Sequence, residues 1–244
     1  MKVYLVIPCY RESLRIGAYL PSLCAEMDRI GGVDVVVVED GSDAEEQNVM
    51  KCMLEKLRTQ FSCLVDPLLL PDNFGKGGAI YSGWEQATDA MKWVGFVDAD
   101  GACPAFEVSR LINSIRLLNN DRKVFFASRV KMLGRRVDRL LKRHLLGRIY
   151  ATLVSEVLHI PVYDSQCGLK LVPREAFLKI KNRLQITGFA FDVELMVSLL
   201  DSGYEIEEVP IDWREIPGGK VSLVRDSFRM ARDVWAIKKR RKKG

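Results

Sequence analysis

The most constraining feature of the sequence is an unbroken run of apolar, mostly β-branched residues, VDVVVVED, at positions 33–40. A strand with one solvated face alternates apolar and polar residues, so a continuous run predicts a strand buried on both faces. Four further apolar runs lie at residues 3–8, 63–70, 93–100 and 123–128. Segments of helical spacing lie between them, at residues 14–30, 44–61, 78–91 and 106–118. Strands that alternate with helices predict an α/β fold with a mostly parallel sheet and crossover helices.

The second half of the chain is dominated by helical patterns. Residues 140–158 have apolar positions every four residues, at Leu141, Leu145, Ile149, Leu153 and Val157. Later segments predict a helix at 189–203, a strand at 204–213 and a final helix that is basic and amphipathic. That last helix would carry its apolar face on Phe228, Ala231, Val234 and Trp235. No linker rich in Pro, Gly or Ser separates the halves, so we expect a single domain over residues 1–244, with halves 1–128 and 129–244.

Charge is distributed unevenly along the chain. Residues 129–148 contain eight Lys/Arg and one acidic residue, and residues 220–244 contain ten Lys/Arg and two acidic residues. The rest of the chain is therefore acidic: its net charge is −10, and the net charge of the whole chain is +5. Such clustering favours an anionic partner, namely nucleic acid, an anionic membrane or phosphate groups. Solvated helix faces and a disordered tail are the alternative. Few aromatic residues in these segments are spaced to stack on bases, so no nucleic-acid partner is expected.

Other broad classes are disfavoured by the same composition. No apolar stretch approaches the ~20 residues that span a bilayer, and the first apolar run is too short for a signal-peptide core. Six cysteines without CxxC pairs and only two histidines argue against a zinc site. We therefore expect reduced cysteines and a cytoplasmic protein.

Polar motifs follow four of the predicted strands: PCYRE, EDGSD, DADG and ASR. Ligands of open parallel sheets bind at the carboxyl ends of the strands. The sequence therefore predicts that one rim of the sheet carries Glu12, Asp40, Asp98, Asp100 and Arg129.

The DADG motif can be interpreted in two ways. Residues i and i+2 of an extended chain point the same way, so Asp98 and Asp100 can present both carboxylates to one point. Mg²⁺ is typically held by one or two carboxylates plus substrate phosphates. The alternative is a simple turn, because Asp and Gly are common turn residues. The EDGSD motif also allows two interpretations, a binding site or a helix start, since Ser42 or Asp43 could merely cap the next helix. The glycines around Lys76 could cradle a phosphate at a helix N-terminus, although neither GxxxxGK[ST] nor GxGxxG is present.

The order of PCYRE, EDGS, GKGGA, DADG and ASR resembles the inverting family 2 glycosyltransferases of the GT-A type. In the second half, YDSQCGLKLVPREAF, GFAFDVELM and VPIDWREIPGGKVSLVRDSFRM are similar to the polyprenyl-phosphate glycosyltransferases. The similarity is greatest to the dolichyl-phosphate β-glucosyltransferases and then to the dolichyl-phosphate mannose synthases, and it covers nearly the whole chain. It implies a GT-A, Rossmann-like fold with a C-terminal amphipathic helical elaboration. Residues 1–128 would bind the nucleotide sugar and residues 129–244 the acceptor.

The resemblance also implies roles on the donor side. Pro8, Tyr10 and Glu12 would line the base and ribose, and Asp40 would contact the base. Lys76 would lie beside the nucleotide pocket, and the C-terminal loop would bring Lys220 and Arg225 towards the diphosphate.

For the metal and the acceptor, the resemblance implies a second set of roles. Asp98 and Asp100 would hold Mg²⁺ or Mn²⁺, with Asp98 near the ribose and Asp100 a direct ligand. Arg129 and Arg143 would hold the acceptor phosphate. Two departures stand out: neither the N-terminal anchor nor the C-terminal transmembrane helices of many relatives is visible, and a serine of the family pattern is replaced by Gly147.

The predicted function is metal-dependent, inverting transfer of a hexose to a polyprenyl phosphate at the membrane surface. UDP-glucose is the favoured donor, and GDP-mannose and UDP-N-acetylhexosamines remain open. A lipid phosphate is mostly ionised near pH 7, because its second pKa is about 6, so it needs no strong general base. Asp164 is the candidate if a base exists, or else it forms a structural hydrogen bond.

The basic segments predict peripheral attachment at the cytoplasmic face of an anionic membrane, through residues 129–158 and the C-terminal helix. A helix packed on the core or on a second subunit is the alternative for residues 141–157. Three other functions stay open: transfer to a glycan hydroxyl in surface polysaccharide synthesis, nucleotidyl transfer, and a non-catalytic membrane-surface or nucleic-acid binding module.

Overall fold

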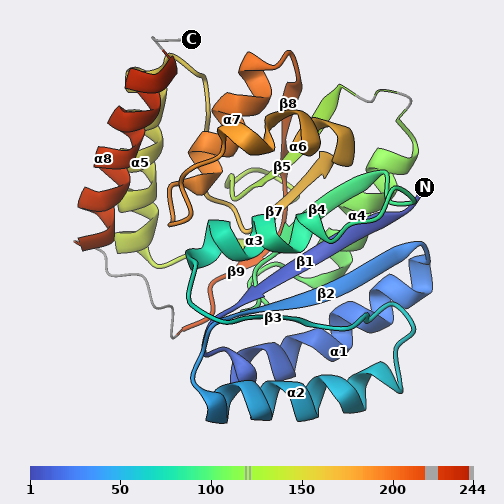
Figure 1. Cartoon of the computed structure of the whole chain (residues 1–244). Helices are drawn as coiled ribbons and strands as arrows, with labels where there is room; N and C mark the ends of the chain where they lie inside the picture. Colours follow the sequence, from blue (N-terminus) through green and yellow to red (C-terminus); the bar gives the residue numbers. More distant parts are fainter. Residues whose placement is uncertain (119, 121, 218–224, 242–244) are drawn as a thin grey trace.

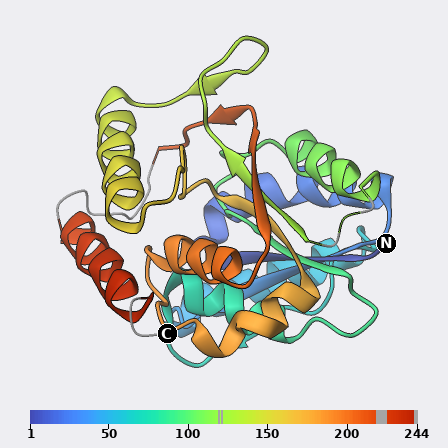
Figure 2. The same ribbon diagram turned by 90° about the horizontal axis from the view of Figure 1, so that it is seen from above.

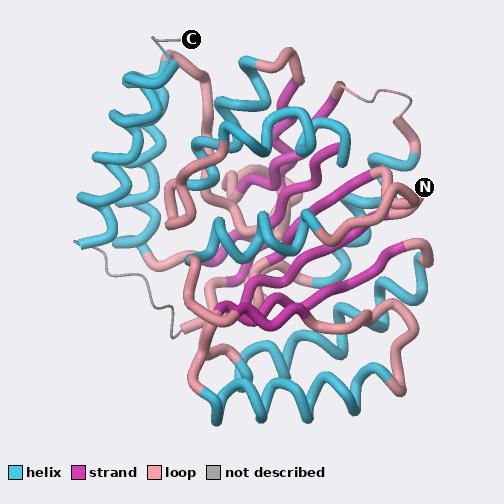
Figure 3. The backbone as a smooth tube through the Cα atoms, viewed as in Figure 1, coloured by secondary structure: helices cyan, strands magenta, loops and turns pink. Residues whose placement is uncertain are grey.

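The computed structural model describes the whole chain except residues 119, 121, 218–224 and 242–244. Its centre is a seven-stranded sheet with the order β3-β2-β1-β4-β7-β5-β8, visible in the middle of the molecule in Figure 3. The strands of this sheet are β1 Val3–Cys9, β2 Val33–Asp40, β3 Leu68–Leu70, β4 Trp93–Val97, β5 Lys123–Ser128, β7 Leu169–Pro173 and β8 Glu205–Pro210. A small second sheet pairs β6 Val137–Asp138 with β9 Trp213–Arg214 in parallel.

Helices connect the strands and cover both faces of the sheet (Figure 1). They are α1 Ser13–Ile30, α2 Ala44–Arg58, α3 Gly75–Glu85, α4 Ala105–Arg116, α5 Leu141–Leu158, α6 Arg174–Ile180 with the 3₁₀ turn η1 Lys181–Arg183, α7 Phe191–Asp201 and α8 Arg225–Arg241. The predicted α/β class is therefore confirmed, and so are the main strands and helices of the first half. The predicted strand over 63–70 is interrupted: Leu64 forms an isolated parallel bridge with Val35 of β2, and Leu68–Leu70 then pair with the end of the same strand. The structure also adds β6, β7, α6 and η1, which the sequence pattern did not suggest, and it divides the predicted strand 204–213 into β8 and the start of β9.

The β-branched run in β2 is buried on both faces, as its pattern predicts. Val33, Val35 and Val37 face one core with α1, α2 and α4. Val36 and Val38 face a second core, which contains residues of α3 and α5–α8. Figure 2 shows these two layers on either side of the strands.

One strand runs against the rest of the sheet. β7 pairs antiparallel with both β4 and β5, whereas β1, β2, β3, β4, β5 and β8 run in one direction. The residues before β7 therefore lie at the edge where the other strands end. This reversal brings the YDSQCG segment, residues 163–168, to the rim that carries DADG.

Helices α5 and α8 lie side by side on the flank of the molecule (Figures 1 and 2). The guanidinium of Arg241, at the end of α8, donates a hydrogen bond to the carbonyl of Leu158, at the end of α5, so the helices run in the same direction. The single apolar face predicted for α8 is wrong. Val234 packs into the core with Met230 and Ile237, whereas Phe228 and Trp235 are exposed.

The apolar positions of α5 are also divided between two environments. Val157 is buried, but Leu141, Leu145 and Ile149, which we call the apolar stripe, are 71%, 53% and 66% exposed. The predicted 4-residue spacing is present, but the first half of the helix turns these side chains away from the protein. No helix among the residues described is long and apolar enough to cross a bilayer.

Candidate active site

The DADG segment leaves the end of β4 directly at the rim. The backbone N–H of Asp98 donates to the carbonyl of Gly168 at 2.9 Å, which joins DADG to the segment before β7. A Cβ at position 168 would lie 2.2 Å from Oδ2 of Asp98, so only glycine leaves room for this carboxylate. Gly168 is thus a site residue that sequence analysis did not single out.

Asp98 and Asp100 are close enough to affect each other electrostatically. Burial raises the pKa of Asp100, and the neighbouring charge of Asp98 raises it further. The Oδ1 of Asp100 accepts a hydrogen bond from the N–H of Ala102. This hydrogen bond and the positive charges of Lys76 and Arg15 lower the pKa of Asp100 and offset part of the rise.

Lys76 is the cation next to this carboxylate pair. Its Nζ lies 2.7 Å from Oδ1 of Asp98 and 5.5 Å and 5.9 Å from the ring centroids of Phe96 and Phe191. Burial alone would lower the pKa of Lys76, but Asp98 and then Asp192 outweigh it and raise the pKa. The ammonium group is therefore charged and lies against Asp98, and its place beside a nucleotide stays a prediction.

The glycines around Lys76 have a different role from a phosphate cradle. They lie inside the first turns of α3, not before the helix. The N–H groups of Gly77 and Gly78 both donate to the carbonyl of Thr187, and a Cβ at Gly77 would lie 2.5 Å from the side chain of Phe191. Glycine therefore permits close packing of α3 on residues 187–191, and a phosphate would have to be met by the Lys76 side chain instead.

Asp40 ends β2 and fixes the start of α3. Its two carboxylate oxygens accept the N–H groups of Phe74 and Gly75, at 2.8 Å and 2.9 Å. Burial raises the pKa of Asp40, and these two N–H groups offset part of that effect. Asp40 is buried at the rim, and its role towards a base stays a prediction.

Three predicted donor residues surround the end of β1. Pro8 is in the strand, Tyr10 follows it beneath the Arg11 guanidinium, and Glu12 precedes α1. Glu12 accepts a hydrogen bond from Nε of Arg15 at 2.6 Å, and its other oxygen binds Nη2. Arg15 also has a buried Nη1 without a partner among the residues described.

Sequence analysis missed Arg15. Its pKa is raised first by the hydrogen bond to Glu12 and then by Asp100 and Asp98, which places it beside DADG. The i,i+3 spacing of Glu12 and Arg15 at a helix start was the available signal.

The acceptor side of the rim is built on an arginine–aspartate pair. Nε and Nη2 of Arg129 donate to the two oxygens of Asp164, each at 2.7 Å, and the Arg129 N–H adds a third bond at 3.0 Å. The guanidinium also lies over the Trp213 ring, 5.1 Å from its centroid. Burial would raise the pKa of Asp164, but Arg129 outweighs it and holds the pKa well below its usual value. The pair is thus ionised and fixed in orientation.

The segment that carries Asp164 is held by the neighbouring strand. Glu208 in β8 accepts the N–H groups of Tyr163 and Asp164, at 2.9 Å and 2.8 Å. Because β8 pairs with β5, the same strand pair that ends at Arg129 also positions its partner.

Asp98 and Asp100 suit a divalent cation. The charge of Asp98 raises the pKa of Asp100, and a cation bound between two such carboxylates would relieve this repulsion. Among the residues described, no cluster of three or more His, Cys, Asp or Glu forms a complete cage. Mg²⁺ typically keeps one or two carboxylates and completes its shell with phosphates and water, which fits this pair.

Three of the predicted site residues lie outside what the structure describes. Lys220 is in the segment that is not described. Arg143 and Arg225 are in α5 and α8, but their side chains are not described. Their roles stay predictions.

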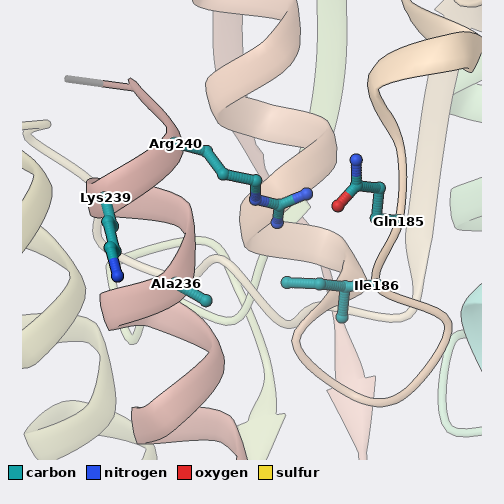
Figure 4. Close-up of a pocket in the computed structure, with 5 residues that line it drawn as sticks. All are labelled: Gln185, Ile186, Ala236, Lys239 and Arg240. Carbon is teal, nitrogen blue, oxygen red and sulfur yellow. The ribbon is translucent and has the colours of Figure 1, made fainter. Parts of the chain in front are cut away.

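A surface pocket of about 380 Å³ lies elsewhere, between α8 and the segment before α7 (Figure 4). It is lined by Gln185, Ile186, Ala236, Lys239 and Arg240. No residue of the rim lines this pocket.

Comparison with known proteins identifies the family of the chain. The family model for glycosyl transferase family 2 matches residues 4–180. Dolichyl-phosphate β-glucosyltransferase of Saccharomyces cerevisiae is 33% identical over 246 residues, which cover 96% of this chain and 73% of the relative. The human protein of the same name is 28% identical over 96% of this chain and 74% of its own length.

Solved structures agree on the fold. Glucosyl-3-phosphoglycerate synthase from Mycobacterium tuberculosis, in complex with Mn²⁺, UDP-glucose and phosphoglyceric acid, has a TM-score of 0.68 at 17% identity, covering 97% of this chain and 78% of that one. Mannosyl-3-phosphoglycerate synthase from Rubrobacter xylanophilus has a TM-score of 0.69 at 17% identity, covering 99% and 74%. The matching family model and the yeast relative together show that this chain belongs to glycosyl transferase family 2 and is a glycosyltransferase.

Proposed function

We propose that this protein transfers glucose from UDP-glucose to a polyprenyl phosphate of the dolichyl type at the surface of an anionic membrane. The observation that carries the proposal is the juxtaposition at one rim of a carboxylate pair, Asp98 and Asp100, and a fixed guanidinium, Arg129. Gly168 links the two, since it binds the Asp98 N–H and lies four residues after Asp164. Such a rim suits a metal-bound diphosphate on one side and a phosphate on the other.

The choice of glucose rests on relatives. The curated relatives from yeast, Dictyostelium discoideum and human are named dolichyl-phosphate β-glucosyltransferases. A structural neighbour was solved with Mn²⁺ and UDP-glucose. GDP-mannose is the second donor to test.

The proposed reaction is a direct displacement at the anomeric carbon. A phosphate oxygen of the lipid forms the new C–O bond as the bond to the nucleotide diphosphate breaks, with inversion at that carbon. A divalent cation held by Asp98 and Asp100 would neutralise charge on the diphosphate. Lys76 adds a positive charge beside Asp98, and Arg129 aligns the attacking phosphate.

We propose that Asp164 positions Arg129 and does not act as a base. A base that works near neutral pH needs a pKa close to that pH. The pKa of Asp164 is instead held low by Arg129, and both of its oxygens accept guanidinium N–H groups. A phosphate that is already ionised has no proton to lose, so the reaction needs no base here.

The membrane is the proposed location because apolar and basic side chains are exposed together near the acceptor side. Besides the apolar stripe of α5, Met132 and Leu133 are exposed in the loop that follows Arg129, the latter to 98%. Phe228 of α8 is 76% exposed. The surrounding segments are strongly basic, and basic amphipathic elements bind the interface of anionic membranes.

The competing function is transfer to a glycan hydroxyl. A hydroxyl must lose a proton as it attacks, so that reaction needs a general base near the rim. The pairing of Asp164 with Arg129 favours the phosphate acceptor.

The test is a transfer assay with purified protein, Mn²⁺ or Mg²⁺, a short polyprenyl phosphate and labelled UDP-glucose, followed by extraction into an organic solvent. We expect label in the organic phase, with less from GDP-mannose. Metal-dependent hydrolysis or binding of the nucleotide sugar without labelled lipid would contradict the proposed acceptor.

A further inference from the structure

Lys170, in β7, is a charged side chain enclosed by the core. It is 0% exposed, and the register of the sheet places it opposite Phe96 of β4 and Phe126 of β5. Residues that lie opposite each other on neighbouring strands point to the same face, and both phenylalanines belong to the core layer that contains residues of α3 and α5–α8. Nζ of Lys170 accordingly lies 5.2 Å and 4.8 Å from the centroids of these two rings.

Two groups pair with this ammonium. Oδ1 of Asp192, in the first turn of α7, lies 2.5 Å from Nζ of Lys170, and the carbonyl of Cys167 accepts a hydrogen bond from the same Nζ at 2.9 Å. Asp192 is itself only 3% exposed. Burial raises the pKa of Asp192, and the charges of Lys170 and Lys76 offset part of that rise. The ion pair thus joins β7 to the start of α7 inside the protein.

Stability alone does not account for a buried ion pair of this kind. Two charges lose about as much free energy on leaving water as their attraction returns, and apolar side chains of the same volume often serve a fold equally well. The neighbours of Lys170 in β7 are apolar, and Leu169, Leu171 and Val172 are all fully buried. Lys170 therefore needs a second role, and its contact with the Cys167 carbonyl indicates one.

The Cys167 carbonyl is next to the residue that contacts DADG. Gly168, which follows Cys167, accepts the N–H of Asp98 on its carbonyl at 2.9 Å, and its missing side chain leaves the room that Oδ2 of Asp98 occupies. The peptide group between Cys167 and Gly168 is planar, so a hydrogen bond that fixes the Cys167 carbonyl also fixes the Gly168 N–H and Cα. Lys170 therefore restrains the surface against which the Asp98 carboxylate packs.

A second link runs from the ion pair to Lys76. Asp192 directly follows Phe191, and the centroid of the Phe191 ring lies 5.9 Å from Nζ of Lys76. Lys76 in turn pairs with Oδ1 of Asp98 at 2.7 Å. One oxygen of Asp98 is therefore held by a lysine that adjoins the Asp192 end of the ion pair, and the other oxygen packs on the segment that Lys170 restrains.

We infer that Lys170 and Asp192 are positioning residues for the donor side of the rim: from inside the core they hold both neighbours of the Asp98 carboxylate, and so set the affinity for a nucleoside diphosphate bound with its divalent cation. Both residues are buried, so they act through Asp98 and do not contact the donor. The inference rests on the proposed function, because it takes Asp98 and Asp100 to hold the cation of the donor. Groups that orient a metal-binding side chain typically change metal affinity or activity by about 10–100-fold when they are removed.

The test replaces both charges at once, in a double variant that combines Lys170→Met with Asp192→Asn. Each new side chain has nearly the volume of the old one, and no buried charge is left without its partner, so the fold should be retained. The control is Val172→Ala, which removes an apolar group from the same strand and the same core layer but no charge. We expect the Kd for UDP in the presence of Mn²⁺, measured by calorimetry, to rise about tenfold in the double variant. In Val172→Ala it should stay close to the wild-type value.

A merely structural ion pair would give a different pattern. It would lower the melting temperature in both variants and leave UDP binding alike in the two, and that result would overturn the inference. The KM for a short prenyl phosphate is the second readout. It should not change in the double variant, because Asp164 is held by Arg129 and Glu208 and not by Lys170. Equal increases in the donor Kd and the acceptor KM would also overturn the inference.

The inference and the proposed function can fail separately. If the wild type transfers no sugar to prenyl phosphate but binds UDP or GDP with Mn²⁺, the proposed function fails, and the comparison of variants with the nucleotide that binds still decides the inference. A wild type that binds neither nucleotide with Mn²⁺ overturns both. If circular dichroism shows that the double variant is unfolded, Asp192→Asn alone is compared with Val172→Ala: weaker nucleotide binding supports the inference, and equal binding overturns it.

Discussion

The two sides of the rim are built from opposite charges. On the donor side, the carboxylates Asp98 and Asp100 lie close together, and the pKa of Asp100 is raised although Lys76 and Arg15 are near it. On the acceptor side, the guanidinium of Arg129 is held by both oxygens of Asp164. The difference teaches that one sheet edge can carry carboxylates suited to a cation and a guanidinium suited to an anion. Under the proposed function, the carboxylates would hold the cation of the donor diphosphate and the guanidinium would hold the acceptor phosphate.

The largest expected effect comes from removing a carboxylate on the donor side. Asp100→Asn should lower turnover by on the order of 10³-fold, because it removes a metal ligand whose charge stabilisation is worth several kcal/mol. Turnover with saturating donor and acceptor measures it, with chelation of the metal as a parallel arm. Asp66→Asn, at an exposed aspartate that pairs with Arg58 at the end of α2, is the matched control. Turnover within about tenfold of that of the control would contradict the assignment of Asp100 as a metal ligand on the donor side.

Gly168→Ala sharpens the link between the two sides. The new Cβ would lie 2.2 Å from the Asp98 carboxylate and must displace it. A displacement of about 1 Å at a reacting centre costs about 10²-fold in rate, so turnover should fall by that order while far-ultraviolet circular dichroism stays unchanged. Metal-dependent UDP binding by calorimetry should weaken in parallel. Normal UDP binding with lost transfer would mean that Gly168 serves the acceptor instead.

Asp164→Asn tests how the acceptor side is held. Arg129 would keep a neutral partner only, so the acceptor KM should rise on the order of tenfold and the free energy of unfolding should fall by about 1–3 kcal/mol. Titration with each substrate, and urea unfolding, measure the two quantities. If turnover instead drops by about 10²-fold or more while the acceptor KM stays unchanged, Asp164 is a base.

The pH dependence of the wild type is an independent check on Asp164. Its folded-state pKa lies below the usual 3.8, so the ion pair contributes stability above that unfolded-state value, lost only as pH falls through the lower folded-state pKa. No limb of the turnover profile between about pH 5 and 9 should therefore come from this residue. A limb in that range that disappears in Asp164→Asn would contradict the ion-pair role.

The smallest expected effect concerns the membrane side of α5. Ile149→Ser removes one exposed apolar side chain from the apolar stripe and should weaken binding to anionic vesicles about threefold, the value of part of a buried aliphatic side chain. Leu117→Ser, at an 88% exposed leucine after α4, is the control. Sedimentation with vesicles of phosphatidylserine and phosphatidylcholine measures both. Equal losses would show that the apolar stripe has no special role at the membrane.

The donor side could be predicted from sequence because its geometry is local. Parallel strands end at one edge, so a polar motif after each of β1, β2, β4 and β5 must meet the others there. The carboxylates of Asp98 and Asp100 and the charge of Lys76 follow from residue types and from the order of the motifs. The pairing of Lys76 with Asp98, and the places of Arg15 and Gly168 beside DADG, needed the coordinates.

The acceptor side depends on contacts that no local pattern encodes. The reversal of β7 brings Asp164 to Arg129 across 35 residues. Amphipathic spacing located the helices α5 and α8 but not which of their apolar residues face outwards. Phe228 and Val234 look equivalent in sequence, and packing against α5 and α7 separates them.

The most direct test of the whole account is transfer from labelled UDP-glucose to two acceptors that share one short prenyl chain, a phosphate and the free alcohol. The fixed guanidinium of Arg129 predicts efficient transfer to the phosphate, with the alcohol slower by at least about 10²-fold, since it offers no negative charge to this group. Comparable rates with both acceptors, or a preference for the alcohol, would contradict the assignment of the arginine side to a phosphate.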